Sequence, residues 1–140
     1  MRDLAEKLRG LERTLSEEKG PFNLFALFLR EDAPDVWDLV VAAKWIEEDR
    51  PVALAEISRR VRDSLRADEI TKISRVVLVE RTDPAVKAIA TAMSIEHGIA
   101  EAANSTFFGL AIRHAFVITA ELDPPPNKVL QRTAAAGGRR

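Results

Sequence analysis

The stretch from Phe107 to Thr119 alternates between two kinds of side chain, and no other segment constrains the fold as much. In an extended chain, one side carries mostly large apolar residues and one imidazole, namely Phe108, Leu110, Ile112, His114, Phe116 and Ile118. The other side carries mostly small residues, namely Phe107, Gly109, Ala111, Arg113, Ala115, Val117 and Thr119. A period of two predicts a β-strand, and the sizes predict that the large side chains, His114 included, face a core.

Further runs predict the rest of a sheet. Residues 24–29 and 74–81 contain continuous apolar segments, which are typical of strands covered on both faces, and we expect residues 24–29 in a central position. After the turn cluster Glu31–Asp35, residues 36–43 form a second apolar run. The two runs and the turn between them predict a β-hairpin. Residues 99–104 predict a short strand that leads into the long one.

The N-terminal segment, residues 2–18, predicts an amphipathic helix that ends at Gly20 and Pro21. Its apolar stripe consists of Leu4, Leu8, Leu11 and Leu15. The same spacing also fits two heptads. Two interpretations are therefore open: the stripe packs on the chain's own sheet, or it forms the interface of a homo-oligomer.

Two more helices are indicated by their start signals. Asp49 and Asp83 are helix caps followed by proline, and residues 44–49 are expected to be a loop. The inward stripes are Leu54, Ile57, Val61 and Leu65 in the first helix, and Val86, Ile89 and Met93 in the second, which is expected to stop at His97 and Gly98. The order is helix, strand, strand, helix, strand, helix, short strand, strand. It predicts an α+β fold with a single mixed sheet of four or five strands and three covering helices.

The length of 140 residues suits one domain, which we place at residues 1–122. After Glu121 the sequence reads Asp-Pro-Pro-Pro and then becomes rich in alanine and glycine. Consecutive prolines cannot enter the interior of a sheet, so we expect residues 123–140 to form a flexible tail.

Charge and composition argue against several classes of protein. The 21 basic and 22 acidic side chains leave a net charge of −1, which gives no general attraction to nucleic acid or to an anionic membrane surface. No apolar run approaches the roughly 18 residues that span a bilayer. Cysteine is absent, which rules out disulfides and thiolate metal sites and fits a reducing cytoplasm. The chain has no glycine-rich phosphate loop, no Gly-x-Ser-x-Gly elbow and no His-Glu-x-x-His pair, and we expect no cofactor.

Two carboxylates stand out in the predicted strands. Asp38 interrupts an apolar strand, and Glu80 lies at the exit of another. Carboxylates at neighbouring strand ends form many divalent-metal sites, so both are candidate metal ligands and catalytic residues, with His97 or His114 as the base. The competing interpretation is that both face solvent or pair with arginines of the same strands.

The histidines, the tryptophans and one asparagine are further candidates. His114 is either a core residue with a hydrogen-bond partner or the start of a site, and His97 is expected to cap a helix end. A pocket lined by Trp37, Trp45 and His114 is a separate hypothesis. The remaining candidate ligand-binding residue is Asn104.

One cluster of arginines occurs in the sequence, made of Arg59, Arg60, Arg62 and Arg66. The acidic residues Asp63 and Asp68 dilute its charge, and aromatic residues that could stack on bases are absent nearby. We interpret the cluster as a solvated helix face.

Two stretches resemble known families. The strands, helix and acids of residues 22–81 are similar to the restriction-endonuclease-like fold, in which a strand aspartate precedes a Glu-x-Lys on the next strand. Asp38 matches that aspartate, whereas the later segment reads Glu80-Arg81-Thr82 and lacks the lysine. More broadly, residues 33–41, 96–98 and 104–115 resemble those of a family of small bacterial proteins of unknown activity. This resemblance implies a bacterial, cytosolic domain and no particular activity.

Taken together, these patterns predict a small cytoplasmic interaction or assembly domain that forms a homo-oligomer. Its expected interface is the leucine stripe of the first helix, and no complete catalytic set is present in the sequence. The alternative is a divalent-metal-dependent, nuclease-like hydrolase that uses Asp38 and Glu80.

Overall fold

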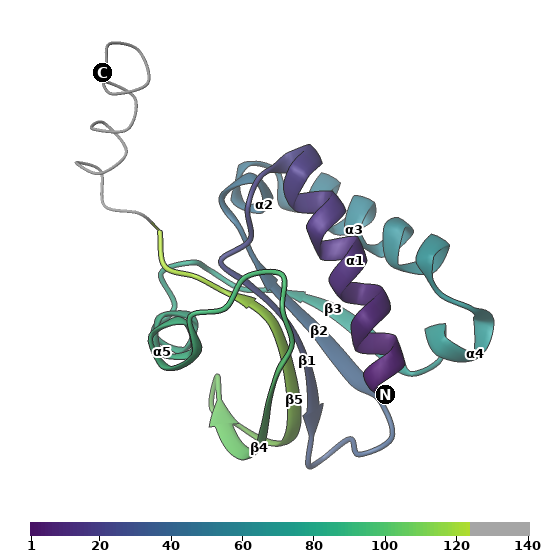
Figure 1. Cartoon of the computed structure of the whole chain (residues 1–140), viewed down its shortest axis with the longest axis vertical. Helices are drawn as coiled ribbons and strands as arrows, with labels where there is room; N and C mark the ends of the chain where they lie inside the picture. The colour runs from purple at the N-terminus through teal and green to yellow at the C-terminus, as the bar shows by residue number, and fades with distance from the viewer. Residues whose placement is uncertain (124–140) are drawn as a thin grey trace.

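Five strands form one mixed sheet in the computed structural model, which describes residues 1–123 (Figure 1). They are β1 (Leu24–Arg30), β2 (Trp37–Ala42), β3 (Ile73–Leu78), β4 (Ala100–Phe107) and β5 (Leu110–Ala120). Their order across the sheet is β3-β2-β1-β5-β4. β2 and β3 run parallel, and the other neighbouring pairs are antiparallel. The predicted α+β class with a single mixed sheet is therefore confirmed.

The helices are α1 (Arg2–Lys19), α2 (Lys44–Glu48), α3 (Arg50–Ser64), α4 (Ala67–Ile70) and α5 (Pro84–Met93). α3 lies in the crossover between the parallel strands β2 and β3, as the sequence predicts. The short helices α2 and α4 were not expected, and α2 replaces the loop predicted at residues 44–49. None of the helices in the described part of the chain combines the length and apolar composition that crossing a bilayer requires.

The larger core lies between α1, α3 and one face of the sheet, and Figure 1 shows α1 and α3 side by side over the strands. The leucine stripe of α1 is at most 6% exposed and packs in this core with Phe25, Leu27 and Leu39. Of the two interpretations of the stripe, packing on the chain's own sheet is therefore the observed one. The homo-oligomer interface predicted at Leu4, Leu8, Leu11 and Leu15 has almost no exposed surface there.

The smaller core lies on the opposite face of the sheet, beneath α5. Val86, Ile89 and Ala90 of α5 pack there on residues that include Leu24 and Val117. α5 leaves part of this face uncovered, and a small cavity of about 80 Å³ opens there between Phe28, Val40 and the tip of the β4–β5 hairpin.

Both predicted helix starts are confirmed. The side chain of Asp49 accepts a hydrogen bond from the Val52 N–H, and that of Asp83 accepts one from the Ala85 N–H. Some other details differ: Leu54 is 39% exposed, and Ala53 takes its place in the buried stripe of α3. α5 ends at Met93, before the predicted stop, because Ser94 adopts a left-handed conformation with φ of 40°.

The segment from Phe107 to Thr119 is only partly one strand. Phe108 and Gly109 have φ of 56° and 72° and form the tight turn between β4 and β5. Irregularities in the β1–β5 pairing then shift the alternation along β5. As a result, Ile112 packs in the α5 core, whereas Phe116 and Ile118 pack in the α1 core, so the large side chains do not share one face.

The flexible tail predicted at residues 123–140 concerns a segment that, apart from Asp123, lies outside the described residues.

Candidate functional site

β3 lies at an edge of the sheet, although its aliphatic sequence predicts a strand that is covered on both faces. The rest of the described chain covers this strand only partly, because the side chains of Val76, Val77, Leu78 and Val79 are all half-buried. Strands with continuous aliphatic sequences are usually covered on both faces and paired on both sides. This strand therefore has the composition of a central strand and the environment of an edge.

The outer edge of β3 offers unpaired backbone groups. Val79 donates its backbone N–H to the carbonyl of Val41 on β2, at 3.0 Å. Backbone groups of successive strand residues point to alternate sides, so Val77 also faces β2, while Val76 and Leu78 turn their N–H and C=O groups outward. Within residues 1–123, β2 is the one strand that pairs with β3.

The opposite edge strand, β4, differs in the features that limit pairing with a further strand. Its sequence is Ala-Glu-Ala-Ala-Asn-Ser-Thr-Phe, and Asn104 interrupts it with a left-handed φ of 51°. Charged residues and local irregularities of this kind protect natural sheet edges. β3 likewise has one charged side chain, Arg75, and its pairing with β2 is irregular between Ile73 and Arg75, but none of its residues has a positive φ and its second half, Val76–Leu78, is uninterrupted and aliphatic.

A second feature is an open cavity of about 410 Å³ on the α1 side of the sheet, beside the start of α1. Its lining residues are Met1, Leu29, Trp37, Glu101, Arg113, His114 and Phe116. The ring of His114 packs on those of Trp37 and Phe116, with centroid distances of 5.9 and 4.8 Å. The structure therefore brings two sequence candidates, Trp37 and His114, to one cavity.

Polar contacts connect three side chains at the wall of this cavity: His114, Glu101 and Arg2. The Nε2 atom of His114 lies 3.0 Å from Oε1 of Glu101, and the other oxygen of that carboxylate accepts a hydrogen bond from Nη1 of Arg2 at 2.7 Å. The His114 side chain remains 34% exposed. Arg113 makes no ion pair with any residue in the described range. Glu101 and Arg113 were not predicted at a site, because only the β4–β5 register brings them beside His114.

The other two candidate ligand-binding residues lie apart from this cavity. Trp45 packs its ring edge-on against Phe22, with centroids 5.6 Å apart, and lines a different cavity near the start of α3. Asn104 lines a neighbouring polar cavity with Glu31 and Arg113. The predicted grouping of Trp37, Trp45 and His114 is thus only partly observed.

Asp38 and Glu80 have separate partners. Asp38 lies on the α5 side of the sheet, its side chain 8% exposed, with Arg75 at 3.3 Å and Arg30 at 3.7 Å. Glu80 is largely exposed and pairs with Arg50 at 2.7 Å. No three carboxylate or imidazole side chains among residues 1–123 are grouped as metal ligands would be. The candidate metal ligands are therefore occupied by arginines and do not converge with a histidine.

His97 does not cap a helix but contacts α1 across the sheet edge. Its Nδ1 atom lies 2.5 Å from Oε1 of Glu12, and its backbone N–H donates to the hydroxyl of Thr119. Thr119 in turn donates to the other oxygen of Glu12 at 2.7 Å. Glu12 is fully buried, so the three residues form a polar cluster inside the α1 core. The cluster holds α1 on the sheet, and this is a structural role.

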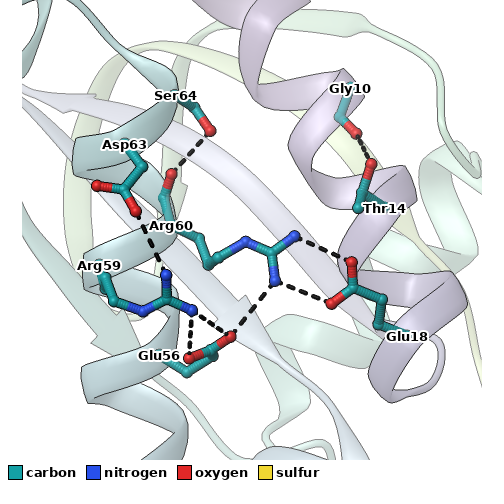
Figure 2. A network of polar contacts seen from close by, with 8 residues as sticks. All are labelled: Gly10, Thr14, Glu18, Glu56, Arg59, Arg60, Asp63 and Ser64. Carbon is teal, nitrogen blue, oxygen red and sulfur yellow. Dashed lines mark hydrogen bonds and ion pairs between the residues drawn. The ribbon is translucent and has the colours of Figure 1, made fainter.

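The arginine cluster of α3 forms ion pairs with its own helix and with α1 (Figure 2). Arg60 donates two hydrogen bonds to Glu18 of α1 and one to Glu56, while Arg59 bonds Glu56 and Asp63. The hydrogen bond from Arg60 lowers the pKa of Glu18, and that from Arg59 lowers the pKa of Glu56. Arg60, with a half-buried side chain, therefore links α3 to α1, whereas the exposed Arg59 pairs within α3, in agreement with a solvated helix face.

Searches of protein-family models, of curated proteins and of solved structures return no significant match to this chain.

Proposed function

We propose that this chain is a self-assembling domain in which two copies join along their β3 strands. The observation that carries the proposal is the position of a continuous aliphatic strand at a sheet edge with outward backbone groups unpaired among the described residues. An exposed strand edge pairs readily with a second strand, and closed two-fold dimers are the commonest homo-oligomers. The predicted homo-oligomer is thus retained, with its interface moved from α1 to β3.

The alternation of the backbone limits how two β3 strands can pair. In an antiparallel dimer, residues that turn outward must face residues that turn outward, so Val76 and Leu78 supply the hydrogen bonds. A two-fold axis at Val76 satisfies this condition. Counted along the strands, it also places Lys72, just before one strand, opposite Glu80, just beyond the end of the other. The irregular pairing between Ile73 and Arg75 lies between Lys72 and the axis, and the Lys72 carbonyl accepts a hydrogen bond from Trp37 of β2, so this contact depends on the long Lys72 side chain and not on the strand alternation. Because symmetry repeats this contact, two attractive charge pairs support this register.

The side chains also favour such an arrangement. Val76 and Leu78 pack at the margin of the α1 core, and Val77 and Val79 pack at the margin of the α5 core. Pairing with a second strand would extend both apolar faces across the interface and remove these half-exposed valines and leucine from water. Burial of apolar area contributes about 25 cal/mol per Å².

Substitution of one residue tests the proposal. Val76→Pro removes an N–H that faces away from β2, the one strand paired with β3 among residues 1–123, and proline is tolerated at such outward positions of an edge strand. We expect the wild-type chain to have twice its 15.5 kDa mass in light scattering, and the proline variant to be a monomer with an unchanged far-UV circular dichroism spectrum.

Val76→Thr is the matched control, because it keeps the N–H and the branched β-carbon and should remain a dimer. A wild-type chain that is monomeric at high micromolar concentration would contradict the proposal. A proline variant that remains a folded dimer would also contradict it, since another surface would then hold the copies together.

The proposed setting of this assembly is a bacterial cytoplasm. The absence of cysteine fits the reducing conditions of a cytoplasm. The metal-dependent hydrolase has less support, because Asp38 and Glu80 pair with different arginines.

A further inference from the structure

We propose that the cavity containing Trp37 and His114 binds a small carboxylic acid with an apolar body. The cavity lies against β2, β1, β5 and β4, and none of its lining residues belongs to β3. The inference is therefore independent of the proposed assembly and extends to a second function of the chain.

The floor of the cavity is apolar and rigid. Trp37 and Phe116 are at most 6% exposed, their ring centroids lie 5.4 Å apart, and Leu29 packs at the margin of the same core. The ring of His114 lies against both aromatic rings and exposes one edge to the cavity. An open cavity with such a floor and a few polar groups at its wall is the usual form of a small-molecule site.

The polar groups at the wall select an anion. The carboxylate of Glu101 already accepts from Arg2 and contacts His114. The guanidinium of Arg113 has no acidic partner among the described residues, and no contact in that range engages Nδ1 of His114. The pair that Arg2 forms with the lining carboxylate of Glu101 has no net charge, so the guanidinium of Arg113 gives the wall a surplus of positive charge that a single negative group on the ligand would neutralise.

A carboxylate fits this wall better than a phosphate or an ammonium group. The planar guanidinium of Arg113 matches the two oxygens of a carboxylate, to which it can donate two parallel hydrogen bonds. A doubly charged phosphate is strongly hydrated and would gain nothing from the apolar floor. An ammonium group would face the unpaired guanidinium. The apolar body of the acid would cover Leu29 and the exposed edge of His114.

Tryptophan fluorescence gives a direct readout. Trp37 and Trp45 are the two tryptophans of the chain, and Trp45 lies in a different part of the core, so Trp45→Phe leaves Trp37 as the reporter. We expect phenylacetate to change the emission of Trp37 in a saturable manner at millimolar concentration or below. Phenylacetamide, which has the same shape without the charge, should bind at least about tenfold more weakly, because a charge-assisted hydrogen bond contributes about 1.5 to 3 kcal/mol.

Variants in the Trp45→Phe background assign the site. Arg113→Gln should weaken phenylacetate binding at least about tenfold, whereas Arg62→Gln, an exposed arginine on α3, should leave it unchanged. Inorganic phosphate should not displace phenylacetate. The inference is overturned if phenylacetate gives no saturable change, if phenylacetamide binds equally well, if phosphate competes effectively, or if a folded Arg113→Gln variant binds as the parent does.

Discussion

Nδ1 of His97 lies 2.5 Å from a carboxylate oxygen of Glu12, a residue in the middle of α1 that is completely removed from solvent. Because a carboxylate only accepts hydrogen bonds, the imidazole donates from Nδ1, and the Thr119 hydroxyl donates to the second oxygen. One buried side chain thus joins α1, the loop after α5 and the end of β5.

Removal of this buried carboxylate should destabilise the fold strongly. Glu12→Ala leaves His97 and Thr119 without their acceptor and creates a cavity, and we expect a loss of about 3 kcal/mol in the free energy of unfolding, measured by urea denaturation. Glu17→Ala, at an exposed position of the same helix, should change it by less than about 0.5 kcal/mol. Equal effects of the two substitutions would show that the Glu12 contacts contribute nothing.

The charges at the ends of β3 should control dimer affinity. Lys72→Glu converts two attractive contacts between copies into repulsive ones, and we expect the dissociation constant to rise about 3- to 10-fold at low salt. Lys72→Glu combined with Glu80→Lys should restore most of the affinity. Sedimentation velocity measures both. A double variant that dimerises more weakly than the single variant would exclude a register in which Lys72 approaches Glu80.

Acid should destabilise the contact between α1 and α4. The hydrogen bond from Lys7 lowers the pKa of Glu69, and the backbone N–H of Arg66 lowers it further. A depressed pKa in the folded state adds stability above the unfolded pKa, about 4.3 for glutamate, and this stability is lost as pH falls through the lower, folded pKa.

Lys7→Met should raise the pKa of Glu69, and the variant should therefore lose less stability than the wild type between pH 7 and pH 3. Urea midpoints at the two pH values measure this difference, and Lys87→Met, at an exposed position of α5, is the control. An acid sensitivity in Lys7→Met equal to that of the wild type would be inconsistent with this linkage.

Divalent metal should not stabilise the chain. Asp38 is held by Arg75 and Arg30 and Glu80 by Arg50, so neither carboxylate is free to act as a ligand. We expect millimolar Mn²⁺ or Mg²⁺ to leave the melting temperature unchanged. A rise in melting temperature that Asp38→Asn abolishes would instead support the hydrolase.

Local signals predicted much of the fold. The helix starts at Asp49 and Asp83 and the first hairpin depend on capping and turn residues close in sequence, and the structure has them as predicted. The predicted burial of β3 on both faces was wrong: an aliphatic run does not specify which neighbours cover it, and at the sheet edge Val76 to Val79 are only half-buried. The faces of β5 were wrong because irregular pairing with β1 shifts the alternation, and a bulge has no clear signature in the side chains.

The sequence singled out two residues of the cavity beside α1, Trp37 and His114, because each is unusual within its own strand. Trp37 and His114 share a cavity as proposed, whereas Glu101 enters it through cross-strand register, which depends on two segments at once. Glu12 could have been found: it lies four residues after Leu8 and three before Leu15, on the buried side of α1. The charge of Glu12 predicts a solvent-exposed position. In the structure the buried carboxylate is instead satisfied by the imidazole of His97, which is distant in the sequence.

The amide hydrogens of Val76 and Leu78 provide the most direct test of assembly along β3. Because both N–H groups turn away from β2, no other strand of residues 1–123 bonds them, whereas the β3 strand of a second copy can protect them from exchange. Hydrogen exchange followed by NMR should show protection of both amides, comparable with that of Val77, at concentrations where the chain is dimeric, and loss of that protection on dilution. Rapid exchange at Val76 and Leu78 alongside a protected Val77 at every concentration would contradict the account.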